Sequence, residues 1–568
     1  MPFSESGAAP GRQRGPLGGR GGRPRRGDRV GDLACERLDG SRTRSHAELR
    51  GAWAVLGDGA EDAFEVARRR WLLSHTIRAS RCASVEDLSR AHSISSSDGV
   101  NASDRSRDAH PLERRVGGVI DRRHPHLKDT TDRTPIRSLG ASTTGYCMSM
   151  IEYDSPVSFR GQLQRGRGAA VHRTSTAPGA ADTVYECVIT DTRWDRQVDQ
   201  RDSYLAGLIA RLDLPLAPIQ QHLLTYDGED AEPVELALQV LALLPMVGRL
   251  DAAAVLRGYA IDGPHWSTAL EAIVDSGAMK LPTIWDGLAD DIIANRDDAQ
   301  LAQAIWCDTE PWTTFAQSQP RVRRIIDELR ASRSPGPARR DTRPEIVAID
   351  NEDLIGLVAA GGFEQPRALE ELGRRGDRIV FDFAEDSGLR NAAGWLPGIP
   401  QALHHLGPDA LPRARTWIGS GDDTLVAFGE RVVAEVGDRG DAPVLLAALH
   451  RTVVAGEWCA AEVPARGLGR LGIHEAASEL MAAWEGTVHS LAREAFLDGL
   501  RGCAPHEAEA VMVEGLDDCE PTVQQRACEA APDTAAVRSR LRELTADPLA
   551  PEVHEAANTK LQFLAIDP

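Results

Sequence analysis

The chain has 568 residues and a formal net charge of −20, from 65 basic and 85 acidic side chains. This length is enough for about two to four domains, and the acidic balance argues against general binding of DNA or RNA. No apolar stretch approaches the roughly 18 residues of a membrane-spanning helix, and the N-terminus lacks the apolar core of a signal peptide, so we expect a cytoplasmic protein without a membrane contact.

The first 147 residues differ in kind from the rest of the chain. Residues 1–147 carry a net charge of +7 and include the low-complexity run Gly-Gly-Arg-Gly-Gly-Arg-Pro-Arg-Arg at 18–26. We predict a disordered N-terminal extension here. Because no methionine lies between Met1 and Met148, we hypothesise that the native protein starts at Met148 or Met150. The alternative is an arginine- and glycine-rich arm that binds RNA.

Residues 148–330 have the pattern of an irregular domain of helix pairs. The short basic segment 160–167 is interpreted as a solvated lead-in. Apolar residues at helical spacing then predict helices at Tyr204–Leu212, Leu216–Leu224, Val234–Leu244, Asp251–Tyr259, His265–Val274, Ile284–Ile293 and Arg321–Leu329. Glycine, proline and aspartate between them predict the connecting turns.

The densest aromatic and acidic cluster of the sequence is Trp306-Cys-Asp-Thr-Glu-Pro-Trp312, with Trp285 nearby along the chain. A pocket formed by Trp306, Asp308, Glu310 and Trp312 would stack a cation or hold an arginine of a protein partner. These four residues are our candidate partner-binding site. The alternative is that the tryptophans pack in the core or between helices.

Residues 331–345 are rich in Ser, Pro and Arg, and they predict a flexible basic linker. After the linker, the alternating run at 378–383 predicts one short strand, and helices are expected to resume at Leu389. We assign residues 346–568 to a second domain, which carries 19 basic and 37 acidic groups.

Two nine-residue stretches, Thr487–Ala495 and Thr522–Ala530, are near-copies 35 residues apart. In each, a valine is followed four residues later by an alanine, a spacing that places both on one face of a helix. Comparable pairs of a larger and a small residue are Leu425/Gly429, Val463/Gly467, Val488/Ala492, Val523/Ala527 and Val553/Ala557. Their average spacing of 32 residues predicts repeated units of two helices each.

The best unit, Leu516-Asp-Asp-Cys-Glu-Pro-Thr-Val-Gln-Gln-Arg-Ala-Cys-Glu-Ala530, resembles HEAT and armadillo-type repeats, including the phycobilisome-lyase-like HEAT variety. The resemblance covers residues 405–565, although an arginine occupies the expected place only at Arg526. It implies an all-α fold, an α-solenoid of antiparallel helix pairs that holds a protein partner along a concave face. Enzymes on HEAT-like frames, such as alkylpurine DNA glycosylases and bilin lyases, are the alternative, but a glycosylase requires a basic groove.

Motifs that suggest catalysis or cofactor binding have simpler interpretations. The G-x-G-x-x-G match at Gly467–Gly472 lies in the helical phase of the repeat, not after a strand, so we interpret its glycines as packing residues. His474, His506 and His554 each precede a glutamate but lack a second histidine one turn later, as a zinc protease helix requires. No C-x-x-C occurs, and no cysteine and histidine have zinc-ligand spacing. We therefore predict no catalytic, cofactor-binding or metal-binding residue.

These patterns together favour a non-enzymatic scaffold or adaptor, whose acidic surface suits a protein partner with basic patches. An enzyme on a HEAT-like frame and a structural or immunity-type helical protein remain as alternatives. The chain has only three lysines among its 65 basic residues, which indicates codon bias in a GC-rich, bacterial genome.

Overall fold

The computed structural model describes residues 152–566 except 197, 306–308, 333–345 and 392–393. All regular structure in these ranges is helical, and no strand occurs among them. The prediction of an all-α protein is therefore confirmed for this part of the chain. The proposed extension at 1–147 and nearly all of the proposed linker lie outside the described residues. No helix in the described ranges combines the length and apolar character needed to cross a bilayer.

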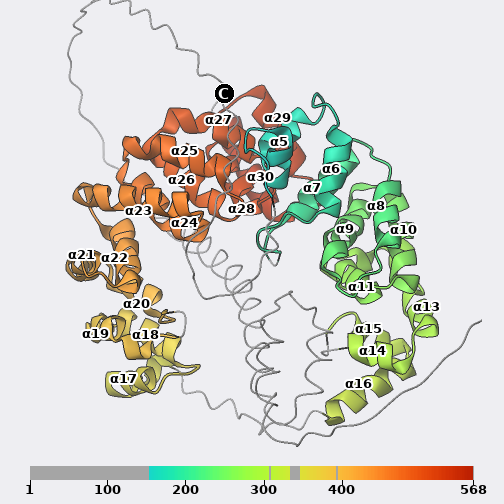
Figure 1. Cartoon of the computed structure of the whole chain (residues 1–568), viewed down its shortest axis with the longest axis horizontal. Helices are drawn as coiled ribbons and strands as arrows, with labels where there is room; N and C mark the ends of the chain where they lie inside the picture. The colour runs from blue at the N-terminus through green and yellow to red at the C-terminus, as the bar shows by residue number, and fades with distance from the viewer. Residues whose placement is uncertain (1–151, 197, 306–308, 333–345, 392–393, 567–568) are drawn as a thin grey trace, which may run out of the picture. The chain divides into compact units, whose positions relative to one another are not determined.

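The first helical region precedes the proposed linker (Figure 1). Its helices are α4 (Phe159–Gln164), α5 (Gly168–Arg173), α6 (Ala180–Ile189), α7 (Arg201–Arg211), α8 (Ala217–Thr225), α9 (Glu232–Leu243), α10 (Leu250–Asp262), α11 (Trp266–Asp275), α12 (Pro282–Trp285), α13 (Leu288–Asn295), α14 (Asp298–Ala304), α15 (Trp312–Ser318) and α16 (Pro320–Ser332). Six of the seven predicted helices are confirmed. The predicted helix Ile284–Ile293 is wrong in one respect, because Gly287 adopts a φ of 73° and divides it into α12 and α13.

The second region contains α17 (Asn351–Ala360), α18 (Gln365–Arg374), α19 (Ile379–Glu385), α20 (Ile399–Leu406), α21 (Leu411–Ile418), α22 (Asp423–Val436), α23 (Ala442–Ala455), α24 (Trp458–Leu471), α25 (Ala477–Gly486), α26 (Ala492–Cys503), α27 (Pro505–Gly515), α28 (Pro521–Ala530), α29 (Ala535–Leu544) and α30 (His554–Ile566). The predicted strand at 378–383 is wrong, because this run forms most of α19. Val380 and Ala384, four residues apart, are both fully buried, so the helical spacing faces the core. Leu389 ends a short 3₁₀ turn, and the next α-helix begins only at Ile399.

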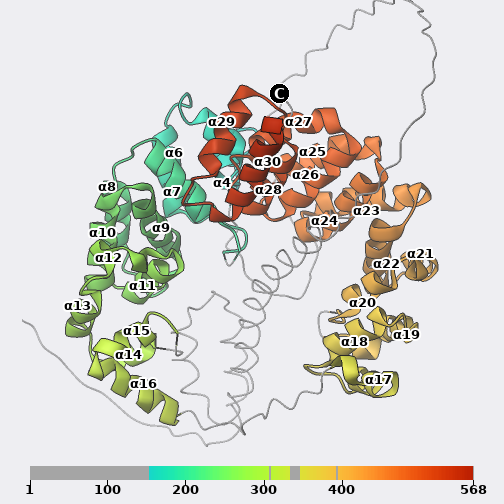
Figure 2. The same ribbon diagram turned by 180° about the vertical axis from the view of Figure 1, so that it is seen from behind.

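Helices of the second region form two layers. Each even-numbered helix from α18 to α30 contacts the next even-numbered helix, and most odd-numbered helices pack beside the even-numbered helix that follows them. Figures 1 and 2 show this succession from both sides for α23 to α28. The contacts thus pair odd-numbered helices with the even-numbered helices that follow them, whereas the arrangement in repeated units stays a prediction.

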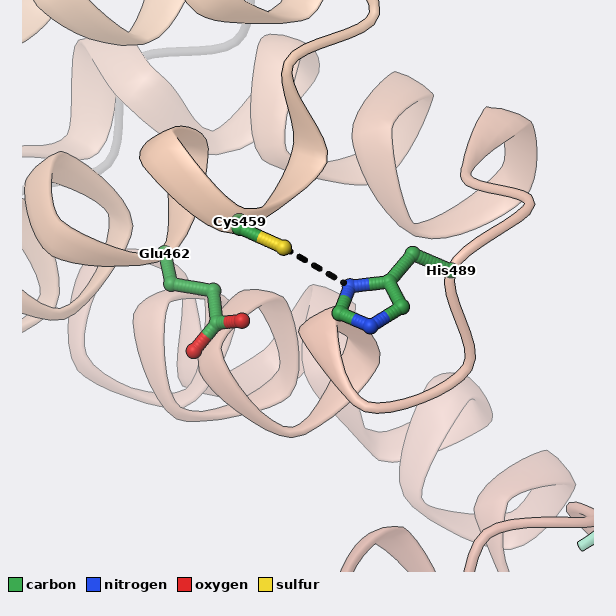
Figure 3. A group of neighbouring side chains, drawn as sticks. All are labelled: Cys459, Glu462 and His489. Carbon is green, nitrogen blue, oxygen red and sulfur yellow. Dashed lines mark hydrogen bonds between the residues drawn. The ribbon is translucent and has the colours of Figure 1, made fainter. Parts of the chain in front are cut away.

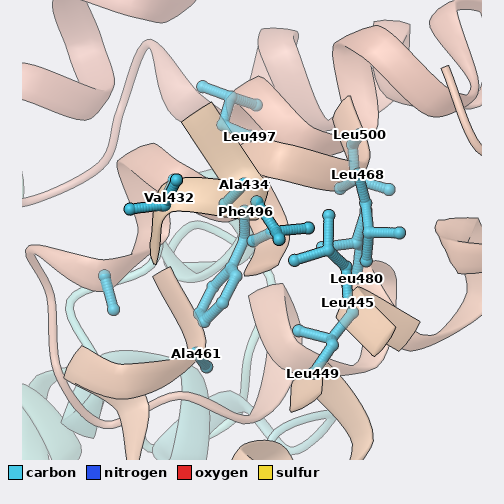
Figure 4. Packing of buried hydrophobic residues seen from close by; sticks show 14 of the residues in the cluster. Val432, Ala434, Leu445, Leu449, Ala461, Leu468, Leu480, Phe496, Leu497 and Leu500 are labelled. Atoms are coloured by element: carbon cyan, nitrogen blue, oxygen red, sulfur yellow. The ribbon is translucent and has the colours of Figure 1, made fainter. Parts of the chain in front are cut away.

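A continuous apolar core lies between the two layers. Figure 4 shows Phe496 surrounded by side chains of neighbouring units, among them Ala461 and Leu480. Glycines bring the helix backbones close together at the centre of this region. A Cβ atom added to Gly469 would lie 2.7 Å from the Cα atom of Gly499, and one added to Gly467 would lie 2.7 Å from the Cα atom of Ala434. The interpretation of the glycine-rich hexapeptide as packing residues is confirmed.

The two nonapeptides that revealed the repeat do not have the same secondary structure. Val523 and Ala527 lie on α28 and are both fully buried, as predicted. Val488, by contrast, lies in the loop before α26, which begins only at Ala492. The shared helical face that the spacing predicts for Val488 and Ala492 is therefore wrong. A proline at the first position of α28, which is absent from the other copy, starts the helix earlier there.

The basic segment 160–167 is not a solvated lead-in. Arg160 is half-buried, and Arg165 and Arg167 are only 6% and 3% exposed. The Arg167 guanidinium donates to both carboxylate oxygens of Glu514, at 2.8 and 2.9 Å, and Arg165 Nε donates to the backbone oxygen of Gly486 at 3.2 Å. These bonds join the start of the first region to the end of the second, as the contact between α5 and α27 also does.

Candidate functional site

The predicted partner-binding residues are only partly described. Trp306 and Asp308 lie outside the described residues. Glu310 is exposed, whereas Trp312 is 5% exposed and packs edge-on against Trp266, with 6.2 Å between the ring centroids. Phe315 also packs edge-on against Trp312. Trp312 thus contributes to the core of the first region, and the proposed pocket of four residues stays a prediction.

A network of buried ion pairs occupies the junction between the two regions. The Arg201 side chain is 1% exposed and pairs with Asp199, its Nη2 lying 2.7 Å from Oδ2. The same Nη2 atom donates to the backbone oxygen of Val488 at 3.0 Å. Nearby, Arg493 of α26 forms a bidentate pair with Asp518, at 2.8 and 2.9 Å, and neither side chain is exposed. Because all these charges have partners, the network can be buried without isolated ions.

Glu520 adds an acid to this network. Its carboxylate accepts a hydrogen bond from Ser490 Oγ at 3.1 Å. Burial, together with the nearby carboxylates of Asp199 and Asp518, raises the pKa of Glu520 well above its ordinary value. A proton on this carboxyl would relieve the charge repulsion with Asp199 and Asp518.

A small cleft opens beside the network, between α7 and the start of α28. Its polar lining includes Gln200, Ser203, Arg211, Asp517, Gln524 and Arg540. Asp517 Oδ1 lies 2.9 Å from Arg540 Nε and 3.8 Å from Arg211 Nη2. Its charge is therefore balanced within the cleft itself.

A different kind of cluster is formed by Cys459, Glu462 and His489 (Figure 3). Cys459 and Glu462 are three residues apart near the N-terminus of α24, a spacing that puts them on one face. His489 comes from the loop between α25 and α26. The Sγ atom of Cys459 lies 3.5 Å from Nδ1 of His489, and one ligand atom from each of the three residues lies within 4.8 Å of the others.

Local contacts fix the position of His489. The hydroxyl of Thr487 donates to the backbone oxygen of His489 and accepts from its backbone N–H, both at 3.1 Å. The imidazole is buried and lies against the indole of Trp194, with 4.4 Å between ring centroids. Cys459, in contrast, is exposed. The cluster is therefore held firmly on the histidine side and open to solvent on the cysteine side.

Sequence reasoning missed this cluster, because it searched for ligands at short spacing. Cys459 and His489 are 30 residues apart, close to one repeat length, and neither lies in a recognised motif. The repeat itself was the available signal, since residues one unit apart on adjacent helix pairs lie close together. The three histidines that precede a glutamate lie elsewhere. His474 and His506 are exposed at helix starts, and His554 Nε2 contacts the backbone oxygen of Asp547.

Comparison of the chain with protein-family models, with curated proteins and with solved structures finds no match.

Proposed function

We propose that this protein is a non-enzymatic scaffold of the HEAT-like α-solenoid type, which binds a protein partner through the even-numbered helices of the second region. The observation that carries the proposal is the series of contacts from α18 to α30, because such a series presents a long side-by-side row of helices. Extended surfaces of this kind are how helical repeat proteins bind other proteins.

Charged side chains cross the row from one helix to the next. The Arg466 guanidinium of α24 lies 3.7 Å from Glu494 of α26, and Arg526 of α28 lies 3.2 Å from the same glutamate. Arg526 also lies 3.8 Å from Asp498 and 3.2 Å from Glu529. We call Glu494, Asp498, Arg526 and Glu529 the charge ladder.

Basic side chains of a partner suit this surface because the second region as a whole has 19 basic and 37 acidic groups. At the ladder itself, the guanidiniums of Arg466, Arg501 and Arg526 lie 3.7, 3.9 and 3.2 Å from ladder carboxylates, so a partner arginine would compete with them. A partner arginine would form charge-assisted hydrogen bonds with these carboxylates. The surrounding negative field would increase the rate of encounter, and added salt would weaken the effect.

Affinity purification from the source cell, followed by mass spectrometry, tests the proposal. The bait is compared with the variant E494Q/D498N, which removes two ladder charges while keeping the side-chain shapes. The control E507Q/E509Q removes two exposed charges of α27, in the other layer.

We expect a partner with a basic segment to bind the wild type and the control but to be lost from the ladder variant. If the ladder variant also retains the partner, the binding surface does not include the ladder. If no protein is enriched over background with the wild-type bait, the scaffold proposal fails.

A further inference from the structure

We propose that Cys459, Glu462 and His489 form a metal site that binds Zn²⁺ through a thiolate, a carboxylate and an imidazole, with one coordination position open. Cysteine sulfur, histidine nitrogen and carboxylate oxygen are the three ligand types that zinc takes from proteins. This inference is independent of the scaffold proposal.

The separation of the two best-placed ligand atoms fits tetrahedral zinc. With a Zn–S bond of about 2.3 Å, a Zn–N bond of about 2.0–2.1 Å and a tetrahedral angle, sulfur and nitrogen lie about 3.6 Å apart. Cys459 Sγ and His489 Nδ1 are 3.5 Å apart. A cation can therefore bind between them without movement of either backbone.

The third ligand is the carboxylate of Glu462, which lies on α24 together with Cys459. Its donor oxygen lies within 4.8 Å of both other ligand atoms, so a rotation of the flexible Glu462 side chain brings it to bonding distance. Glu462 Oε2 accepts a hydrogen bond from Arg466 Nη1 at 3.2 Å. That bond holds the carboxylate from outside, as outer-shell partners do in zinc proteins.

The ligand types select the metal class. A thiolate favours Zn²⁺ over Mg²⁺ and Ca²⁺, which take oxygen ligands. When zinc binds, the Cys459 S–H bond breaks, a Zn–S bond forms and the proton passes to solvent. Nδ1 of His489 binds the metal through its lone pair, so the ring proton resides on Nε2.

The exposure of the site determines its coordination. His489 is buried against Trp194, whereas Cys459 is exposed, so the fourth position faces solvent on the side of the thiol. Three protein ligands and one open position are typical of zinc that binds water or an external donor, whereas purely structural zinc is closed by four protein ligands.

Zinc titration of the full chain tests the proposal. The purified protein is stripped with a chelator, dialysed against Zn²⁺ and analysed for bound metal. The principal variant is C459S, whose exposed position makes loss of folding a poor explanation for an effect; circular dichroism checks this. H489Q is the second ligand variant, and H506Q is its control, since the His506 side chain is fully exposed and does not belong to the cluster.

We expect wild type and H506Q to bind zinc with equal affinity. C459S and H489Q should lose more than the roughly 10–100-fold in affinity that removal of an outer-shell partner costs. Co²⁺ in place of Zn²⁺ should give a thiolate-to-metal charge-transfer band that C459S abolishes. The proposal is overturned if the wild type binds no zinc, or if C459S binds zinc as tightly as the wild type, which would leave only a thiol–imidazole hydrogen bond.

Discussion

At the scale of single residues, the most consequential groups are the buried charges of the junction. Arg493 and Asp518 pair with no solvent exposure, and Arg201 is almost as deeply buried with Asp199. A buried pair is a weak source of net stability, because desolvation offsets much of the attraction. Removal of one member is costly, however, since the other charge is left buried alone.

Replacement of Arg493 by methionine should therefore lower the free energy of unfolding by about 3–5 kcal/mol. The double variant R493M/D518N should recover part of the loss, because no lone carboxylate remains. Chemical denaturation measures both effects, with R501M on the same helix as the control, since Arg501 is exposed. Equal stability of R493M and R501M would show that the pair is not buried in solution.

The raised pKa of Glu520 predicts how the free energy of unfolding changes with pH. Since burial raises its pKa well above the ordinary value of 4.5, the stabilisation from this carboxyl is fully present below about pH 4.5. It decreases as the pH rises through the raised pKa of the folded state. The variant E520Q is neutral at every pH and keeps an acceptor for Ser490.

Unfolding curves at several pH values should therefore show E520Q gaining stability relative to wild type as the pH increases from acid to alkaline. A constant difference between the two proteins across this range would contradict a proton-linked role for Glu520.

At the scale of secondary-structure elements, helix spacing depends on small residues. A Cβ atom added to Gly502 would lie 2.1 Å from the backbone oxygen of Gly469, so α26 and α24 are in backbone contact there. In contrast, a Cβ atom added to Gly356 of α17 would meet no atom within 4 Å. The same substitution should have opposite effects at these two positions.

We expect G502A to lower the free energy of unfolding by about 1–3 kcal/mol, because the two backbones must separate. G356A should raise it by about 0.4–1 kcal/mol, because alanine restricts the unfolded chain more than glycine does. Thermal and denaturant unfolding measure both. A stable G502A protein would mean that the helices do not approach as closely as described.

The positions of long helices were predictable from the sequence, whereas the short helix α19 was not. Long amphipathic helices such as α9 and α16 show several turns of one apolar period, and both were predicted. The run at 378–383 is too short to distinguish a helical period from a strand period. Its structure is decided by packing, because Val380 and Ala384 of α19 are both buried in the core. At Val488, the local pattern was helical but the loop is held by Thr487, a contact that local spacing does not report.

At the scale of the whole molecule, the described start of the chain packs on its end. Arg167 pairs with Glu514, and Trp194 lies against His489. These contacts connect residues more than 290 apart in sequence. The division into domains at 148–330 and 346–568 therefore stays a prediction about chain organisation, but the two stretches are physically joined.

This junction predicts that cleavage of the chain need not separate its parts. With a protease recognition sequence inserted within residues 333–345, the two fragments should elute together in size-exclusion chromatography after cleavage. The substitution R167A should weaken their association, since it leaves Glu514 without its bidentate partner. R160A is the control, because Arg160 forms its ion pairs with Asp154 and Glu186 of its own region. Separation of the wild-type fragments under native conditions would contradict the prediction.

The sequence by itself determined that this protein is helical, acidic and repetitive, because period, charge and small-residue spacing are local properties of a chain. It could not locate the buried Arg165 and Arg167, since basic residues in a short segment are usually solvated. Distant partners change that here, the backbone oxygen of Gly486 for Arg165 and the Glu514 carboxylate for Arg167. The cluster of Cys459, Glu462 and His489 was likewise decided by tertiary structure. Its members become neighbours because α24 packs against α26, and the loop before α26 carries His489 to the start of α24.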